Sequence, residues 1–126
     1  MTRDQLFEFH QKLCADAESL MRRKNADYSK ADTFGNLKSC EAFQICEAET
    51  GILVRLTDKF SRLATLIQRP PECLDESFRD TIIDVINYAV LMAAIRESRT
   101  MPPKSVPSVG MMAHLAEPKP DLEPGF

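Results

Sequence analysis

The stretch that decides the fold is DESFRDTIIDVINYAVLMAAIRESR, residues 75–99, which follows the proline pair Pro70-Pro71. When each residue turns the chain by about 100°, the apolar side chains of its first half gather on one side and the acidic ones on the other. Its first residues are acidic, and acidic side chains suit the positive end of a helix dipole. We therefore predict a helix from about Asp75 to Arg99.

The residues before the proline pair predict a second helix, which begins near Ser39, is interrupted at Thr50-Gly51 and continues to Gln68. Proline cannot continue the hydrogen-bond ladder and restricts the residue before it, so Arg69-Pro70-Pro71 ends this helix after Gln68. The short connection makes the two helices an antiparallel hairpin in which position 58 lies beside position 84. Six apolar residues of the second helix fall within about 100° of its circumference: Ile52, Leu53, Leu56, Phe60, Leu63 and Ile67.

The rest of the chain extends this helical body. Apolar residues at three- and four-residue steps predict a first helix from Thr2, its N-cap, to about Arg23. Residues 24–38 lose that period and gather Asn, Asp, Ser and the first Gly, which indicates a loop long enough to carry function. Six of the eight prolines lie at or after Pro102. We expect an all-α antiparallel helical bundle over residues 1–100 and an irregular, extended Pro-rich tail over 101–126.

The composition argues against several classes of protein. The 126 residues include 16 Lys and Arg against 19 Asp and Glu, for a net charge of -3, and without clustered positive charge a nucleic-acid binder is not expected. The longest apolar stretch is about half of the roughly 20 residues that a membrane span needs, and the N-terminus lacks a signal peptide. The sequence predicts a cytoplasmic protein without a membrane partner.

The four cysteines and two histidines do not form a metal-binding pattern. There is no C-x-x-C pair, and His10 and His114 are interpreted as surface residues. Neither zinc spacing nor a disulfide framework is visible, so we expect free buried thiols.

The candidate chemistry lies on the helix over 75–99. Four polar side chains fall within about 80° of its circumference: Glu76, Asp80, Asp84 and Asn87. Neighbours four residues apart on a helix are separated by about 6 Å, so two of these carboxylates can share a hard divalent cation such as Mg²⁺ or Mn²⁺. The alternative is an ordinary solvated helix face with Arg79 nearby.

Two further sets of residues could complete a site. On the second helix, Asp58 could add a carboxylate across the hairpin while cations hold phosphate oxygens; the cations are Arg55, Lys59 and Arg62. The alternative is a surface Asp58–Arg62 pair. The loop over 24–38 could stack on and hydrogen-bond a nucleobase, although the same residue types are ordinary in turns; they are Lys24, Asp27, Tyr28, Phe34 and Asn36.

Four sequence motifs occur in this order along the chain: Lys-Asn-x-Asp-Tyr at 24–28, Phe-Gly-Asn at 34–36, Gly-Ile-Leu-Val-Arg-Leu-x-Asp-Lys-x-x-Arg-Leu at 51–63 and Asp-Glu-Ser-x-x-Asp-Thr-x-x-Asp-x-x-Asn-Tyr-Ala at 75–89. Together they resemble a phage and prophage family named for its association with nucleotide modification. The chain is similar to a branch of the all-α nucleoside triphosphate pyrophosphohydrolases that include MazG and the dimeric dUTPases. The resemblance implies an oligomeric helical fold whose acidic residues bind Mg²⁺ or Mn²⁺. The metal would activate water to split a nucleoside triphosphate into a monophosphate and pyrophosphate.

The resemblance also implies roles for the candidate residues. Metal would be bound by Asp58, Glu76, Asp80 and Asp84, with Glu76 or Asp80 acting on the attacking water. Arg55, Lys59 and Arg62 would neutralise the triphosphate, and the residues 24–36 with Asn87 and Tyr88 would hold sugar and base. MazG has E-x-x-E on one helix and E-x-x-D on the next, whereas this chain has a single Asp58 and four-residue spacings. Glu49 is a reserve ligand that reaches the site only if the helix breaks at Gly51.

Conversion of dGTP to dGMP is one option among the substrate specificities. The alternative function is a non-catalytic helical nucleotide-binding or scaffold module accessory to DNA modification. In either case we expect a homo-oligomer, a dimer or a tetramer, because roughly 95 helical residues bury a limited core alone.

Overall fold

The computed structural model describes residues 1–28, 34–70 and 76–101, with the side chains of 26–28 left out. These residues form four α-helices and no strand: α1 (Arg3–Tyr28), α2 (Ser39–Ala42), α3 (Ala48–Ile67) and α4 (Glu76–Ser98). The predicted all-α class is therefore confirmed. Within the described part of the chain, no helix is long and apolar enough to cross a membrane.

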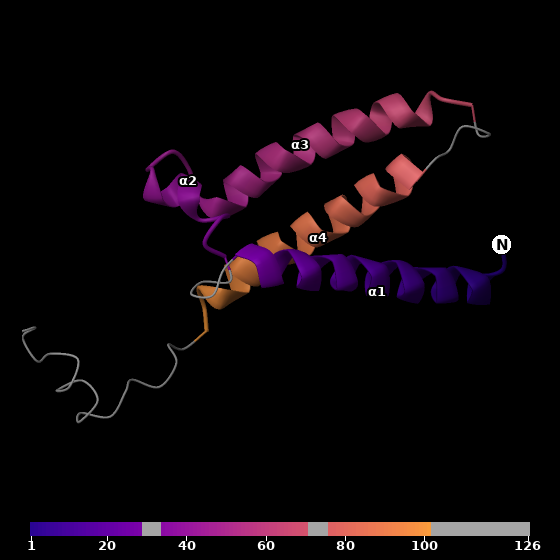
Figure 1. Ribbon diagram of the computed structural model, residues 1–126, viewed down its shortest axis with the longest axis horizontal. Coiled ribbons are helices and arrows are strands. Elements are labelled where there is room, and N and C mark those ends of the chain that lie inside the picture. Colours follow the sequence, from indigo (N-terminus) through magenta and orange to yellow (C-terminus); the bar gives the residue numbers. More distant parts are fainter. Residues whose placement is uncertain (29–33, 71–75, 102–126) are drawn as a thin grey trace, which may run out of the picture.

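Helix α4 is the centre of the arrangement. Helix α3 runs antiparallel along one side of α4, and α1 crosses its other side (Figure 1). Among the described residues, α1 and α3 make no backbone approach to each other, while the short α2 packs on α3. The three long helices therefore form an open layer whose outer helices each have one uncovered side.

The core lies where α3 and α4 meet. Ala48, Ile52 and Leu56 of α3 pack with Ile95 of α4, and all four side chains are buried. Of the apolar stripe predicted on the second helix, only Ile52 and Leu56 are buried and Leu63 is half-buried. The other three are half or more exposed, Leu53 at 50%, Phe60 at 53% and Ile67 at 68%.

The first helix begins as predicted and ends later. Thr2 caps it: its hydroxyl accepts the Gln5 amide at 3.2 Å, and the Gln5 side chain accepts the Thr2 amide at 2.8 Å. This reciprocal pair satisfies two backbone donors at the helix start. The end at about Arg23 is wrong, because α1 runs to Tyr28. Residues 24–28 contain neither glycine nor proline, so nothing in them stops the helix.

The second helix breaks in a different place from the one predicted. It is interrupted at residues 43–47 and not at Thr50-Gly51, which lies within α3. Gln44 has a φ of 58°, and this left-handed conformation turns the chain between α2 and α3. A Cβ on Gly51 would lie 3.0 Å from Cys40 Sγ, so this glycine lets α2 approach α3 closely.

The bounds of the last helix, the C-terminal tail, the histidines and the cysteines were also predicted. Helix α4 begins and ends within one residue of the predicted bounds. The proline-rich tail after Met101, His114 and Cys73 lie outside the described residues. His10 is exposed, as predicted. Cys14, Cys40 and Cys46 are free thiols, but Cys14 is exposed and the other two are half-buried, so the expectation of buried thiols is wrong for these residues.

Candidate functional site

The crossing of α1 over α4 builds the candidate site. Ala17 is 1% exposed at the crossing, and its small side chain lets the two helices approach. Asn87 Nδ2 donates a hydrogen bond of 3.0 Å to the Ala17 carbonyl, and Arg79 donates one of 2.6 Å to Asp16. These contacts hold the C-terminal half of α1 against the N-terminal half of α4.

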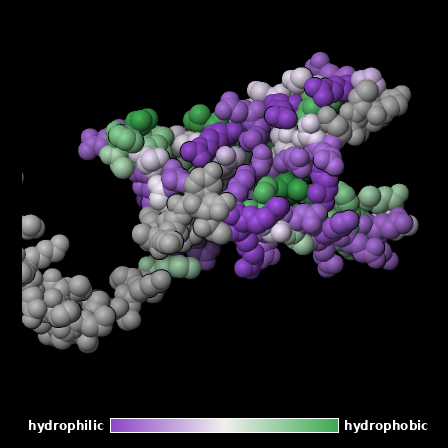
Figure 2. All heavy atoms as spheres, viewed as in Figure 1, coloured by the Kyte–Doolittle hydropathy of each residue, from purple (hydrophilic) through white to green (hydrophobic). Residues whose placement is uncertain are grey.

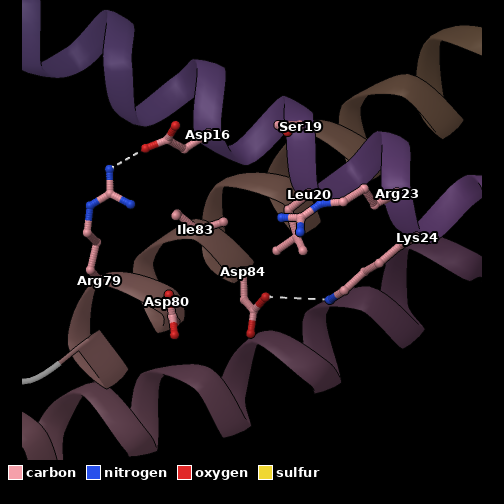
Figure 3. A pocket seen from close by; sticks show the side chains of 9 residues that line it. All are labelled: Asp16, Ser19, Leu20, Arg23, Lys24, Arg79, Asp80, Ile83 and Asp84. Carbon is pink, nitrogen blue, oxygen red and sulfur yellow. Dashed lines mark hydrogen bonds and ion pairs between the residues drawn. The ribbon is translucent and has the colours of Figure 1, made fainter.

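Beside this crossing is a pocket with a volume of about 430 Å³, which is within the range of small-molecule sites. Figure 3 shows side chains from α1 and α4 around it. Six of the nine lining residues are charged, three of each sign: Asp16, Arg23, Lys24, Arg79, Asp80 and Asp84. The other three are Ser19, Leu20 and Ile83. A pocket with this lining suits a ligand that carries several charged groups.

Two lysines converge on Asp84. Lys59 of α3 lies 2.9 Å from one carboxylate oxygen of Asp84, and Lys24 of α1 lies 3.8 Å from the other. The Asp84 side chain is 25% exposed, so the pair with Lys59 is partly shielded from solvent. Side chains from three helices therefore meet at the edge of the pocket, although α1 and α3 do not pack on each other.

Asp80 lies one helical turn before Asp84 and lines the same pocket. Within the described chain, its carboxylate has no hydrogen-bond or ion-pair partner. Figure 3 shows both carboxylates on the same side of α4. Mg²⁺ is usually held by one or two carboxylates together with substrate phosphates and water, and Asp80 with Asp84 fits that arrangement. No three Asp, Glu, His or Cys side chains of the described residues converge into a metal cage.

The structure brings together four of the predicted site residues, Lys24, Lys59, Asp80 and Asp84. The residue of α3 that contacts Asp84 is Lys59, and Asp58 is exposed. The other predicted residues with described side chains do not line the pocket, and five of them are exposed: Asn36, Arg55, Asp58, Arg62 and Glu76.

The remaining predicted residues have packing roles or are outside the described side chains. Asn87 binds the backbone of α1, and Tyr88 packs against the apolar core of α3 and α4. Asp27 and Tyr28 belong to the last turn of α1, with side chains outside the described set. The base-binding role predicted for the 24–36 segment stays a prediction.

Four polar residues of the pocket were not predicted as site residues from the sequence: Asp16, Ser19, Arg23 and Arg79. Three of them belong to α1, for which only the apolar stripe was interpreted. Asp16 directly precedes the buried Ala17, and a polar residue at the edge of a buried apolar stripe lies close to the neighbouring helix. This signal could have identified Asp16, while its partner Arg79 depends on the tertiary crossing.

A second charged cluster fixes the opposite end of α4. Arg99 binds both Glu41 of α2 and Glu49 of α3, the latter at 2.6 Å, and Arg96 adds a contact to Glu49 at 3.4 Å. The pKa of Glu41 is lowered by the Ala48 backbone amide and then by Arg99, and that of Glu49 by Arg99. Glu49 cannot serve as the reserve ligand, because α3 is continuous through Gly51.

No family model, no curated protein and no solved structure matches this chain. The resemblance to all-α pyrophosphohydrolases therefore depends on the four sequence motifs, and the pocket between α1 and α4 is the basis for a functional proposal.

Proposed function

We propose that this chain is a metal-dependent nucleoside triphosphate diphosphohydrolase that releases pyrophosphate and a nucleoside monophosphate. The observation that supports the proposal most directly is the pocket of about 430 Å³ that Asp80 and Asp84 line together with cations of α1 and α4, while Lys59 of α3 pairs with Asp84. Carboxylates that hold a metal and cations that hold phosphates are both needed for this reaction, and the pocket supplies both.

The cations bind the substrate. Lys24 and Arg23 extend from α1 into the pocket (Figure 3), where they bind phosphate oxygens through charge-assisted hydrogen bonds. Lys24 and Lys59 are held by Asp84 before substrate arrives. A triphosphate competes with Asp84 for these two ammonium groups, so its binding frees the Asp84 carboxylate.

The carboxylates act at the reacting bond. Asp80, which has no partner among the described residues, orients the attacking water and accepts its proton as the water attacks the α-phosphorus, the bond between the α- and β-phosphates breaks and pyrophosphate leaves. Asp80 and Asp84 would hold Mg²⁺ or Mn²⁺, which when bound supplies Lewis-acid activation of water and charge stabilisation of the phosphates. Asp58 and Glu76 lie outside the pocket, so Asp80 and Asp84 are the proposed metal ligands.

The proposed substrates are deoxynucleoside and nucleoside triphosphates, with dGTP or GTP as one option. We also propose that the chain is a homo-oligomer. Three apolar side chains lie seven residues apart along α3 and are half or more exposed: Leu53, Phe60 and Ile67. The open layer of helices leaves this side of α3 uncovered.

The test is pyrophosphate release with Mg²⁺ or Mn²⁺ across all deoxynucleoside and nucleoside triphosphates. We expect turnover of at least one substrate, and a loss of about 100-fold or more in Asp80→Asn. Glu97→Gln is the matched control, because Glu97 is an exposed carboxylate at the far end of the same helix. Nucleotide binding without turnover would identify a non-catalytic nucleotide-binding module. The absence of both binding and turnover would exclude both functions.

A further inference from the structure

Two cysteines lie side by side where α2 packs on α3, far from the proposed active site. Their sulfur atoms surround one point, the position that a Cβ on Gly51 would occupy, with Cys40 Sγ 3.0 Å and Cys46 Sγ 3.9 Å away. The pKa of the Cys46 thiol is raised by burial and then by the neighbouring Cys40 thiol. The two thiols therefore flank the same point beside Gly51.

The chain turn that follows α2 produces this contact. Gln44 has a φ of 58°, and the reversed chain brings the amide of Cys46 within 3.4 Å of the Cys40 carbonyl. The path between the two Cα atoms therefore consists of this N–H···O contact, the Cα–C and C=O bonds of Cys40 and the N–Cα bond of Cys46. A disulfide needs Cα atoms about 4.4–6.8 Å apart, a separation that this backbone contact brings within reach.

The surroundings of Cys40 leave its sulfur available for reaction. Cys40 donates only weak hydrogen bonds, to the carbonyls of Leu37 at 3.5 Å and Glu47 at 3.6 Å. Cys40 and Cys46 are both half-buried rather than enclosed in the core. Figure 2 shows this end of the molecule at the surface, and Phe43 and Ile45 of the intervening turn are 76% and 75% exposed. A small oxidant can therefore reach the pair.

We propose that Cys40 and Cys46 are a redox-active dithiol that closes reversibly to an intramolecular disulfide when it meets a low-molecular-weight disulfide such as oxidised glutathione. One cysteine thiolate attacks the glutathione disulfide, forms a mixed disulfide and releases one glutathione. The second cysteine attacks the protein sulfur of that mixed disulfide and releases the other glutathione. Two protein thiols are oxidised, one disulfide is reduced, and the two cysteine protons end on the two released glutathiones.

The bond would fix the turn on which α2 depends. Glu41, which follows Cys40, accepts the Ala48 amide at 2.8 Å and also binds Arg99 at the end of α4. The disulfide would therefore restrict the backbone next to Glu41, whose side chain connects α2 to α3 and to the end of α4. The turn between Cys40 and Cys46 would become a closed ring, while the α1–α4 pocket keeps its own contacts.

The test uses the full-length, folded protein in glutathione buffers of increasing oxidised fraction, with free thiols alkylated before denaturation. Trypsin leaves Cys40 and Cys46 together on the peptide over 39–55, with Cys14 and Cys73 on other peptides. We expect that peptide to lose both alkyl labels and to become lighter by two hydrogen atoms. Reduced dithiothreitol should restore both labels.

Controls separate the native pair from general thiol chemistry. Cys14→Ser should leave the change intact, and Cys46→Ser should yield a glutathione adduct on Cys40 in its place. The same titration in urea should give less of the closed peptide at each buffer ratio, because unfolding removes the turn. Glutathione adducts or intermolecular disulfides in place of the closed peptide would overturn the proposal, as would equal closure in the unfolded chain.

Discussion

At the scale of single residues, Lys59 is the side chain that connects α3 to the pocket. Its ammonium lies 2.9 Å from Asp84 and is 29% exposed. For Lys59→Met we expect the Michaelis constant for the nucleotide to rise by about tenfold, which corresponds to about 1.4 kcal/mol of lost phosphate binding, with a smaller change in kcat. Steady-state kinetics of pyrophosphate release measures both constants.

The stability of the same variant separates binding from folding. A partly exposed ion pair is worth about 1 kcal/mol or less, so urea unfolding should show only a small loss for Lys59→Met. Lys12→Met, at an exposed lysine of α1 outside the pocket, should change neither quantity. An unchanged Michaelis constant in Lys59→Met would limit Lys59 to a structural role.

Gly51 offers a second prediction at this scale. Alanine is about 1 kcal/mol more favourable than glycine within a helix, but a Cβ here would lie 3.0 Å from Cys40 Sγ. We expect Gly51→Ala alone to give no gain in the free energy of unfolding, and Gly51→Ala to be stabilising by about 1 kcal/mol when combined with Cys40→Ala. Urea unfolding of the four proteins measures this double-mutant cycle, and an equal effect in both backgrounds would contradict the close approach.

At the scale of elements, the four-residue helix α2 depends on charged contacts for its position. Glu41 and Glu49 both bind Arg99, and the pKa of each carboxyl lies below its ordinary value of 4.5. A lowered pKa means that these carboxylates stabilise the fold above pH 4.5. Their contribution is lost as the pH falls through the lower values of the folded state.

This arrangement predicts the pH dependence of unfolding. The free energy of unfolding should fall as the pH is lowered from about 5 to about 3, and Arg99→Met should flatten this dependence. Arg22→Met is the control, because Arg22 pairs with Glu18 on the exposed surface of α1. Urea unfolding at several pH values gives the slopes, and equal slopes in wild type and Arg99→Met would show that Arg99 does not set the pKa of these carboxyls.

The sequence predicted elements better than the contacts between them. Helix α4 was found within one residue because its apolar and acidic sides are separated and prolines precede it. The break before α3 was misplaced because Gly51 was interpreted as a turn residue, whereas its function is close packing against Cys40. The spacing of Asp80 and Asp84 predicts that they share one side of α4, as Figure 3 shows, whereas Asp16 and Arg79 meet only through the crossing of α1 and α4. That crossing angle is not encoded in any local pattern.

At the scale of the whole molecule, the open layer of helices leaves large apolar side chains in solvent. Leu53, Phe60 and Ile67 recur every seven residues on α3, beside Leu56 and Leu63. This is the spacing at which one helix packs along another. Helix α4 covers only part of that seam, so the remainder is a suitable surface for a second copy of the chain.

The last prediction follows from this surface. We expect the wild-type protein to sediment as a dimer or a tetramer, and Leu53→Lys combined with Phe60→Lys to sediment as a monomer, because each change places a charge on the uncovered seam. Ser61→Lys, at an exposed polar position of the same helix, should leave the oligomer intact. Helical circular dichroism should be retained in both variants, since Leu53 and Phe60 lie outside the buried core of the single chain. A wild-type monomer at micromolar concentration would contradict the proposal, and an oligomer that survives the double change would place its interface on another face.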